Sequence, residues 1–225
     1  MSTNKIIIFG VLDLAELAHY YISRDTDYEI VGFTVNRDYM VNDKFSPKNS
    51  NKTYNVYPFE NLEDIFSPLE YSLFAPITGS RMNKNRELIY NEGKSKGYGF
   101  ISYVSPRATI NDNIIGENCF IFEDNTLQPF TDIGNNVIIW SGNHIGHHGK
   151  IDDHVFITSH VVISGHCHIK SNSWIGVNST IKDGIIVGEG TLIGMGSLIT
   201  KSTEDECFYM GSPAKKQDKK PIDVI

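Results

Sequence analysis

A branched aliphatic residue recurs at every sixth position between Ile115 and Ile199, fifteen times in succession. An α-helix would repeat at about 3.6 residues and an ordinary strand at about two. A period of six keeps the alternation of a strand but requires one corner in each hexad. The chain is therefore predicted to wind as short, flat strands around a shared axis, which is a parallel β-helix of hexapeptide repeats. The series is Ile115, Ile121, Leu127, Ile133, Ile139, Ile145, Ile151, Ile157, Ile163, Ile169, Ile175, Ile181, Val187, Ile193 and Ile199.

Most hexads also carry a small or β-branched residue two positions before the large aliphatic one. Positions two apart on a strand share a face, so both residues are expected to point into a dry, filled coil. Two of the three cysteines, Cys119 and Cys167, occupy this small position, and the third is Cys207. We interpret them as reduced thiols in a cytoplasmic protein. The small residues are Cys119, Thr131, Val137, Val155, Val161, Cys167, Ser173, Ser179, Thr191 and Ser197.

Charge and hydropathy narrow the possible partners and the location. The formal net charge of -7 argues against nucleic acid or an anionic membrane as the main partner. No apolar run approaches ~18 residues, so no transmembrane span is expected. The opening segment MSTNKIIIFG holds an apolar run of only five residues, which is too short for a signal peptide. These features agree with a cytoplasmic location.

The hexad pattern divides the chain into an α/β domain over 1–104, a β-helix over 105–202 in about five coils, and a tail over 203–225 that breaks the phase. Strands alternate with helices in the first domain, which predicts a small Rossmann-like parallel sheet with its ligand at the carboxyl ends of the strands. The predicted elements are a strand at Lys5–Phe9, a helix around Asp13–Ile22, a strand at Tyr28–Thr34, an irregular segment 38–58, a strand at Leu73–Ile77 and a polar helix near Asn83–Lys96.

Seven of the eight histidines fall between residues 144 and 168. His148, His154, His160 and His166 are six apart, so they occupy the same hexad position on successive faces. His148 and His166 are then expected to stack on one face, with the other two on the remaining faces. A metal needs ligands that converge on one point, so this spread argues against a metal site within one chain. We interpret the four as turn or surface residues, while a site shared between chains stays open.

His147 is the candidate general base. Ile145 points inward, so His147 lies near a corner and can face outward, where a neutral imidazole can take a proton from an amine or hydroxyl. The alternative is a corner residue that only forms a hydrogen bond. Gly165 follows eighteen residues later, directly above His147 in the next coil. Its N–H could stabilise an oxyanion, but from the spacing alone we favour the interpretation as a simple corner glycine.

The first turn of the α/β domain, Gly10-Val11-Leu12-Asp13, carries one glycine, whereas a dinucleotide fold needs several to admit a pyrophosphate. A redox dinucleotide is therefore not expected. A looser nucleotide pocket is predicted from the loops that follow the strands, with Arg86 as a phosphate contact or, alternatively, a surface residue. The candidate substrate-binding residues are Gly10, Asp13, Asn36, Arg37, Thr78, Gly79 and Arg86.

The hexads resemble those of the left-handed β-helix acyltransferases, which use acyl-CoA or acyl carrier protein. The segment His144-Ile145-Gly146-His147 is similar to the H-I-x-H segment of the lipid A UDP-N-acetylglucosamine acyltransferases, whose second histidine is the general base. The spacing of eighteen residues from His147 to Gly165 is similar to the spacing between the base and the oxyanion-hole glycine in that family. The whole layout resembles the bacterial nucleotide-sugar N-acetyltransferases of the bacillosamine type. These belong to a broader family of sugar O- and N-acyltransferases that also resembles the sialic-acid O-acetyltransferases. Their tail is similar to the segment from Gly211 to Lys215.

This resemblance implies transfer of an acetyl group from acetyl-CoA to the amino group of a UDP- or dTDP-linked amino-deoxy sugar, for a surface glycan such as lipopolysaccharide O-antigen. His147 would be the base, with His144 and His148 beside it and no metal. His148 stands where the family usually has an acid. Asp152, Asp153, a carboxylate of a partner chain or His148 itself would then orient His147.

The family forms homotrimers in which CoA lies between adjacent β-helices, and the α/β domain would hold the nucleotide and bring the sugar to His147 of its own or a neighbouring chain. The CoA contacts of the family map to Gly176, Val177, Gly194, Met195, Pro213, Ala214 and Lys215.

Three other functions stay open. The enzyme could acetylate a sugar hydroxyl, or transfer a longer acyl group, because the sugar pocket is built from unrepeated positions. A hydratase of the γ-carbonic-anhydrase type would ligate a metal between subunits through its histidines. A catalytically silent assembly protein would use the corner histidines only for structure. Metal analysis separates the hydratase from the others, and CoA binding separates the transferase from the silent protein.

Overall fold

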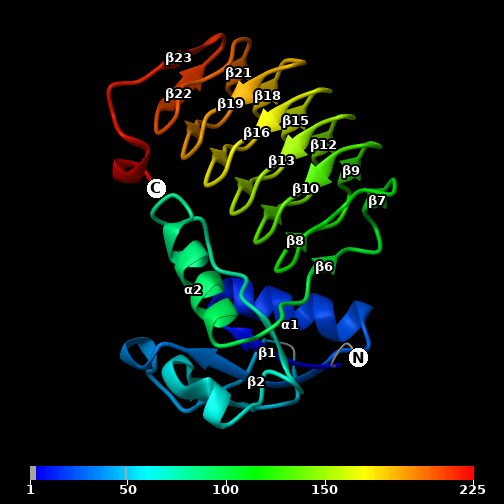
Figure 1. Ribbon diagram of the computed structural model, residues 1–225, viewed down its shortest axis with the longest axis vertical. Coiled ribbons are helices and arrows are strands. Elements are labelled where there is room, and N and C mark those ends of the chain that lie inside the picture. The colour runs from blue at the N-terminus through cyan, green and yellow to red at the C-terminus, as the bar shows by residue number, and fades with distance from the viewer. Residues whose placement is uncertain (1–3, 49) are drawn as a thin grey trace. The chain divides into compact units, whose positions relative to one another are not determined.

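The computed structural model describes residues 4–48 and 50–225, which form two compact units (Figure 1). The first unit contains the chain up to Thr78 and Leu88–Ser102, and the second contains Gly79–Glu87 and Tyr103–Ile225. A single boundary near residue 104 therefore does not describe the chain, because Gly79–Glu87 packs with the β-helix. No helix among the described residues is long and apolar enough to cross a membrane.

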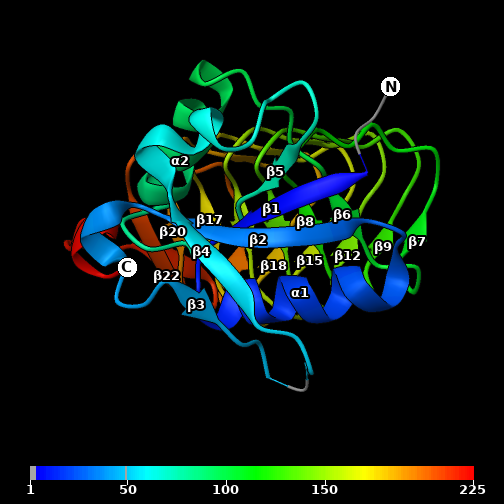
Figure 2. The ribbon, with the colours of Figure 1, turned by 90° about the horizontal axis from the view of Figure 1, so that it is seen from below.

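The first unit is a parallel α/β sheet, as the sequence predicted (Figure 2). Its strands lie in the order β3-β4-β2-β1-β5, and only β3 runs antiparallel to its neighbour. Ile6, Ile7 and Ile8 are fully buried at the centre of the sheet. The elements are β1 (Lys5–Phe9), α1 (Asp13–Asp25), β2 (Glu29–Val35), η1 (Arg37–Tyr39), β3 (Lys44–Phe45), β4 (Tyr54–Pro58), η2 (Phe59–Asp64), β5 (Ser72–Phe74) and α2 (Lys84–Ser95), the last of which begins in the second unit.

The segment 38–58, which was expected to be irregular, contains β3 and β4. β4 pairs with β2 through Val56 and Phe33, both of them buried. Its apolar signal is short and ends in Pro58, which has no N–H for a sheet ladder. β5 is shorter than the predicted Leu73–Ile77, because the N–H of Ile77 turns back to the carbonyl of Ala75 at 3.0 Å.

The second unit is a parallel β-helix of about six turns whose strands are mostly two residues long. The β-helix begins with the strands that start at Tyr103 and Thr109. At the other end, the strand that starts at Phe208 pairs with the last coil of the hexad region, so the β-helix is longer than the five turns expected. The eight-stranded face contains β6 (Tyr103–Val104), β8 (Phe120–Ile121), β11 (Ile138–Ile139), β14 (Phe156–Ile157), β17 (Trp174–Ile175), β20 (Leu192–Ile193), β22 (Phe208–Gly211) and β23 (Ala214–Lys216). The six-stranded face contains β7 (Thr109–Ile110), β9 (Thr126–Leu127), β12 (His144–Ile145), β15 (Val162–Ile163), β18 (Thr180–Ile181) and β21 (Leu198–Ile199). The four-stranded face contains β10 (Asp132–Ile133), β13 (Lys150–Ile151), β16 (His168–Ile169) and β19 (Ile186–Val187), and η3 (Pro221–Asp223) lies near the carboxyl end.

The hexad aliphatics form the core of the coil, as predicted. Each stacks on the residue eighteen positions away, as Ile139 does on Ile121 and Ile157. Those from Ile121 to Ile199 lie in one cluster and are at most 3% exposed. The small inward residues bond to the next coil, since Ser173 Oγ donates to the carbonyl of Gly188 at 2.8 Å. Cys119 and Cys167 are buried, and all three cysteines are free thiols.

Each hexad turns through a residue in the left-handed backbone conformation. The positive φ recurs every six residues from Asp112 to Gly196, and the residues found there are Asp, Asn, His and Gly, which tolerate this region, with Phe130 as the exception. This position explains the spacing of the four histidines, and it confirms that they are turn residues. They have φ of 53° at His148, 64° at His154, 57° at His160 and 57° at His166.

The amino-terminal residues of the second unit cover the apolar outer surface of the eight-stranded face. Met82 packs with Leu192 and Phe208, and Trp174 borders the same cluster. Asn83 Nδ2 donates to the carbonyls of Asn172 and Ser173, each at 3.1 Å. This packing explains why Gly79–Glu87 belongs to the β-helix unit.

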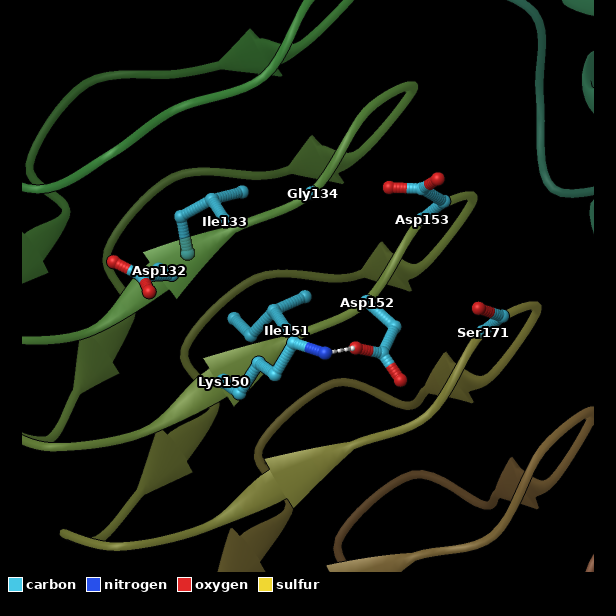
Figure 3. Close-up of a pocket in the computed structure, with 8 residues that line it drawn as sticks. All are labelled: Asp132, Ile133, Gly134, Lys150, Ile151, Asp152, Asp153 and Ser171. Carbon is cyan, nitrogen blue, oxygen red and sulfur yellow. Dashed lines mark ion pairs between the residues drawn. The ribbon is translucent and has the colours of Figure 1, made fainter.

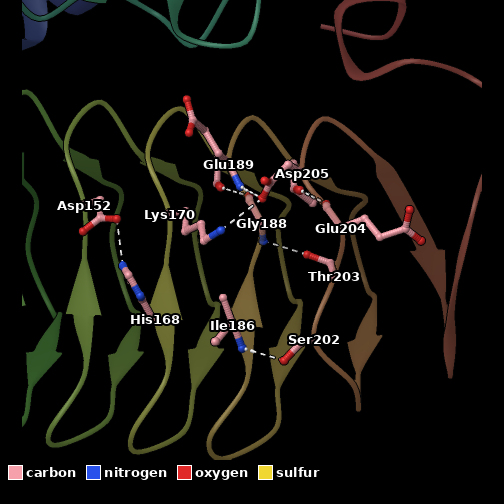
Figure 4. Close-up of polar contacts among 12 residues, drawn as sticks. Asp152, His168, Lys170, Ile186, Gly188, Glu189, Ser202, Thr203, Glu204 and Asp205 are labelled. Atoms are coloured by element: carbon pink, nitrogen blue, oxygen red, sulfur yellow. Dashed lines mark hydrogen bonds and ion pairs between the residues drawn. The ribbon is translucent and has the colours of Figure 1, made fainter.

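The four-stranded face ends at β19, where side chains replace the backbone of a further strand (Figure 4). The N–H of Ile186 donates to Ser202 Oγ at 3.0 Å, and the N–H of Gly188 donates to Thr203 Oγ1 at 2.9 Å. Asp205 Oδ1 accepts the N–H of Glu189 at 2.8 Å. These side-chain oxygens satisfy the edge and so stop further strand pairing there.

Candidate active site

His147 follows β12 at a corner between the six-stranded and four-stranded faces, and its side chain is exposed. Gly165 lies directly beside its imidazole, because a β-carbon on Gly165 would approach His147 Cε1 to 2.8 Å and Nε2 to 3.0 Å. The predicted stacking of Gly165 above His147 is therefore observed. Gly146 completes the close packing, since a β-carbon there would lie 2.5 Å from the nitrogen of Gly165.

The N–H of Gly165 has an unusual environment. The equivalent N–H one coil earlier, that of His147, donates to Gln128 Oε1 at 3.2 Å. The residue that would supply such an oxygen to Gly165 is Gly146, which has no side chain. Within 4–48 and 50–225, the N–H of Gly165 donates to no acceptor of the chain. Gly165 is itself buried, and its nitrogen lies against Gly146.

His148 forms a side-chain hydrogen bond with His147. Their Nδ1 atoms lie 3.0 Å apart, so one ring donates to the other. The two carboxylates considered from the sequence are engaged elsewhere. Asp152 accepts from His168 Nε2 at 2.7 Å and pairs with Lys150 at 2.8 Å, while Asp153 accepts the N–H of Asn135 at 2.6 Å. Burial opposes ionisation of Asp152, but the bonds from Lys150 and His168 outweigh it and lower its pKa.

A column of aromatic rings flanks His147. The ring centroids of Phe130 and His148 are 4.7 Å apart. The ring of His148 stacks on that of His166, as the spacing predicted, with a centroid distance of 5.1 Å and an interplanar angle of 20°. The ring centroids of His147 and His166 are also 5.1 Å apart, and the two ring planes are nearly perpendicular at 88°. Ligand nitrogens of His147, His148 and His166 all lie within 4.8 Å of one another. The four corner histidines alone do not converge, since His154 and His160 lie outside this group, and His147 supplies its third imidazole.

The other histidines have different surroundings. His144 is half-buried on β12, in register with Thr126 and Val162, and Ile145 beside it points inward. His154 is buried, and its Nδ1 lies 2.8 Å from Asn136 Nδ2. The geometry thus brings His147, His148 and Gly165 together, adds His166, and leaves His144 on the preceding strand.

The candidate CoA contacts lie at another corner of the coil. Gly176 and Gly194 follow β17 and β20, and a β-carbon on Gly176 would lie 2.5 Å from the nitrogen of Met195. The side chains of Val177 and Met195 are 39% and 70% exposed in the same column. The segment Gly211–Ala214 forms the turn between β22 and β23, with Lys215 paired to Met210, and the carbonyl of Tyr209 accepts the N–H of Gly194 at 2.8 Å. The sequence-predicted CoA residues therefore cluster around β20 and β22.

Several of the candidate nucleotide contacts lie at the carboxyl ends of β1 and β2. Gly10 has φ of 110°, which favours glycine, and its N–H donates to the carbonyl of Thr34 at 2.8 Å. Asp13 begins α1, whose first N–H groups have no side-chain cap from Leu12. Asn36 and Arg37 follow β2, and the N–H of Arg37 donates to Glu60 Oε1 at 2.8 Å. Thr78 is the last residue of the first segment of this unit.

Gly79 and Arg86 belong to the β-helix unit. Gly79 lies against the indole of Trp174. Arg86 is fully buried and donates to the carbonyls of Asn136 at 3.1 Å and His154 at 2.8 Å. Burial lowers the pKa of Arg86 to about 9. The guanidinium therefore holds the start of α2 on the coil, and both sequence interpretations of Arg86, a phosphate contact or a surface residue, are wrong.

A separate pocket of about 340 Å³ lies along the four-stranded face and its next corner (Figure 3). The ion pair between Lys150 and Asp152 crosses it, and Asp132 and Asp153 line it. Asp152 and Asp153, which the sequence offered as partners of His147, line this pocket, whereas His147, His148 and Gly165 do not.

One stretch of the coil matches a known family of repeats. Residues 166–201 match the bacterial transferase hexapeptide family (six repeats). None of the curated proteins compared with the chain matches it.

Solved structures share the fold over nearly the whole chain. A variant of perosamine N-acetyltransferase from Caulobacter crescentus, in complex with CoA and GDP-perosamine, is 16% identical with a TM-score of 0.83, over 96% of this chain and 97% of that one. The acetyltransferase domain of PglB from Neisseria gonorrhoeae, in complex with acetyl coenzyme A, is 20% identical with a TM-score of 0.83, over 96% and 100%. WeeI from Acinetobacter baumannii is 21% identical with a TM-score of 0.78, over 94% and 99%. The chain therefore has the α/β-plus-β-helix fold of these proteins.

Proposed function

We propose that the protein transfers an acetyl group from acetyl-CoA to the amino group of a nucleotide-linked amino-deoxy sugar. The observation that carries the proposal is the exposed imidazole of His147, which lies on Gly165 and has its Nδ1 engaged by His148. The structures with the same fold support the donor and acceptor classes, since one holds CoA with GDP-perosamine and another holds acetyl coenzyme A.

His147 acts as the general base in this proposal. When its Nδ1–H donates to His148 Nδ1, the lone pair of its Nε2 is free to accept a proton from the attacking amine. The new C–N bond forms as the C–S bond of the thioester breaks, and CoA leaves as a thiolate that regains a proton. His148 stabilises the His147 imidazolium only as a neutral acceptor, so it contributes less than a carboxylate would. General-base catalysis of this kind contributes ~10²–10⁴-fold.

Gly165 supplies the oxyanion contact. Its N–H donates to no acceptor among the described residues, and a β-carbon on this glycine would lie against the imidazole of His147. An oxygen that becomes negative during attack on the thioester can accept this bond, and loss of one such donor typically lowers turnover ~10²–10³-fold. Removing the base and removing the oxyanion donor should therefore have effects of similar size.

A second copy of the chain completes the site in this proposal. His147 follows a strand of the six-stranded face, whereas Gly176 and Gly194 each precede one, so the two groups lie at different corners of one coil. A thioester must approach the reacting amine within about 3–3.5 Å. A homotrimer in which the CoA corner of one chain faces His147 of the next brings the groups together.

The α/β unit binds the nucleotide in this proposal. Gly10, Asn36 and Arg37 lie at the carboxyl ends of β1 and β2, where parallel sheets bind ligands, and α1 begins there without a side-chain cap from Leu12, so that its amino end can face a phosphate. The single glycine of the first turn favours UDP, dTDP or GDP over a redox dinucleotide. We propose a cytoplasmic role in surface-polysaccharide assembly such as that of O-antigen.

Thiol release from acetyl-CoA tests the proposal, with UDP-, dTDP- and GDP-linked sugars that carry either an amino group or a hydroxyl group. Release with an amino sugar alone supports N-acetylation and identifies the nucleotide. Release with hydroxyl sugars alone means O-acetylation instead. If no sugar supports thiol release while CoA still binds, the enzyme uses another acyl donor. If there is neither thiol release nor CoA binding, the proposal is contradicted.

A further inference from the structure

Three imidazoles lie together at the candidate active site, and within residues 4–48 and 50–225 no carboxylate belongs to this group. His147, His148 and His166 are all exposed, and their ligand nitrogens lie within 4.8 Å of one another. The closest pair, the two Nδ1 atoms of His147 and His148, is 3.0 Å apart. An imidazole set without carboxylates suits Zn²⁺, Ni²⁺ or Cu²⁺ and not Mg²⁺ or Ca²⁺.

The β-helix fixes the backbones that carry these rings. His148 and His166 occupy the same corner position one coil apart, and the N–H of His166 donates to the carbonyl of His147 at 2.8 Å. A tetrahedral zinc ion with Zn–N bonds of about 2.0–2.1 Å separates its ligand nitrogens by about 3.4 Å. The closest pair already lies near this separation. Metal binding also requires the exposed ring of His166 to turn toward the other two rings.

We infer that His147, His148 and His166 form a binding site for a borderline divalent metal ion, with zinc as its probe, and that the bound ion switches the enzyme off. The metal takes up the nitrogen lone pairs and replaces the hydrogen bond between His147 and His148. The switching part rests on the proposed function of His147 as the base, because a ligated imidazole cannot accept the proton of the amine. The binding part rests on the geometry alone.

The chain offers a matched pair of variants for the test. His166 and His160 are both exposed corner histidines with φ of 57°, but only His166 belongs to the cluster. Asparagine occupies the same corner position at Asn136 and Asn172 with φ of 57° and 59°, so it preserves the backbone. His166→Asn removes one ligand, and His160→Asn changes a histidine that contributes none.

Calorimetric titration of ZnCl₂ into the purified, metal-stripped full chain measures binding without any substrate. We expect one equivalent to bind the unmodified protein, about tenfold or more weaker binding by His166→Asn, and unchanged binding by His160→Asn. Equal binding by the unmodified protein and His166→Asn would overturn the site. So would the absence of binding by the unmodified protein, or a loss of binding in both variants.

Thiol release in the presence of ZnCl₂ then tests the switch. We expect zinc to inhibit the unmodified enzyme, EDTA to restore its activity, and His166→Asn to need about tenfold more zinc for the same inhibition. Zinc binding without inhibition of an active enzyme would overturn the switch and leave the binding site. If no sugar supports turnover while His166→Asn still loses zinc, then the proposed function fails and the metal site stands.

Discussion

The imidazole of His147 lies so close to the α-carbon of Gly165 that a β-carbon there would be 2.8 Å from Cε1 of the ring. Real β-carbons essentially never approach a neighbour so closely. The absence of a side chain at Gly165 therefore makes room for the imidazole of His147, the proposed base. This relationship ties the position of the base to one residue of the next coil.

Gly165→Ala should displace the His147 ring and lower kcat about 100-fold, since a shift of ~1 Å in a catalytic group has an effect of this size. Steady-state thiol release checks it. Gly99→Ala is the control, because the nearest atom to a β-carbon there is 4.0 Å away and its kcat should not change. A near-normal rate for Gly165→Ala would contradict the assigned contact.

Replacement of His148 tests whether a second imidazole orients the base. His148→Ala removes the partner of His147 Nδ1, which lies 3.0 Å away, and kcat should fall about tenfold, as expected for one charge-assisted hydrogen bond. His148→Asp should recover that loss, since aspartate tolerates the left-handed φ of 53° and supplies a carboxylate to the imidazolium. Equal rates for His148→Ala and the unmodified enzyme would remove His148 from the mechanism.

Arg86→Met should lower the free energy of unfolding by about 3 kcal/mol, because buried carbonyls then lose their charged donor. The affected acceptors include the carbonyls of Asn136 and His154. Urea unfolding measures the change. Arg37→Met should leave the stability unchanged, since Arg37 is exposed, and should alter KM for the sugar nucleotide instead. A stable Arg86→Met protein with a raised KM would restore the phosphate role.

The stability of the coil should fall in mild acid because of His154. Burial lowers the pKa of His154 even though Glu87 beside it favours the charged form. The unfolded chain then binds the proton more readily, so stability is lost as the pH falls from about 6.5 through the pKa of the folded state. His154→Asn should reduce the difference in Tm between about pH 7.5 and pH 5, and His160→Asn should not. Calorimetry that shows the same pH slope in both variants would contradict this.

The repeat could be predicted because a period of six is enforced at every turn of the coil. Each large aliphatic residue packs on those one coil away, so the pattern in the sequence is the pattern of the core. The same regularity placed His148 above His166 and Gly165 above His147. The strand β4 could not be found in this way, because Tyr54–Pro58 has a single buried apolar residue, Val56, and ends in proline.

The site was only partly predictable, because side-chain direction depends on neighbours in space. Spacing along one column could not show that His147 turns toward His148 and His166, which lie on its own and on the next coil. Arg86 was misinterpreted because a helix that looks polar in sequence can insert one side chain among backbone carbonyls. Those acceptors are the backbone carbonyls of Asn136 and His154, about fifty and seventy positions away. Because every residue has a carbonyl, the sequence does not show which of them accept a hydrogen bond from Arg86.

The central claim is that His147 is the base, and one comparison tests it most directly. The kcat for thiol release with the sugar nucleotide found active should be measured for the unmodified enzyme and for His147→Ala, with circular dichroism and Tm to establish that both are folded. The account predicts a loss of at least about 100-fold with unchanged Tm. A folded His147→Ala enzyme that turns over at a near-normal rate would contradict it.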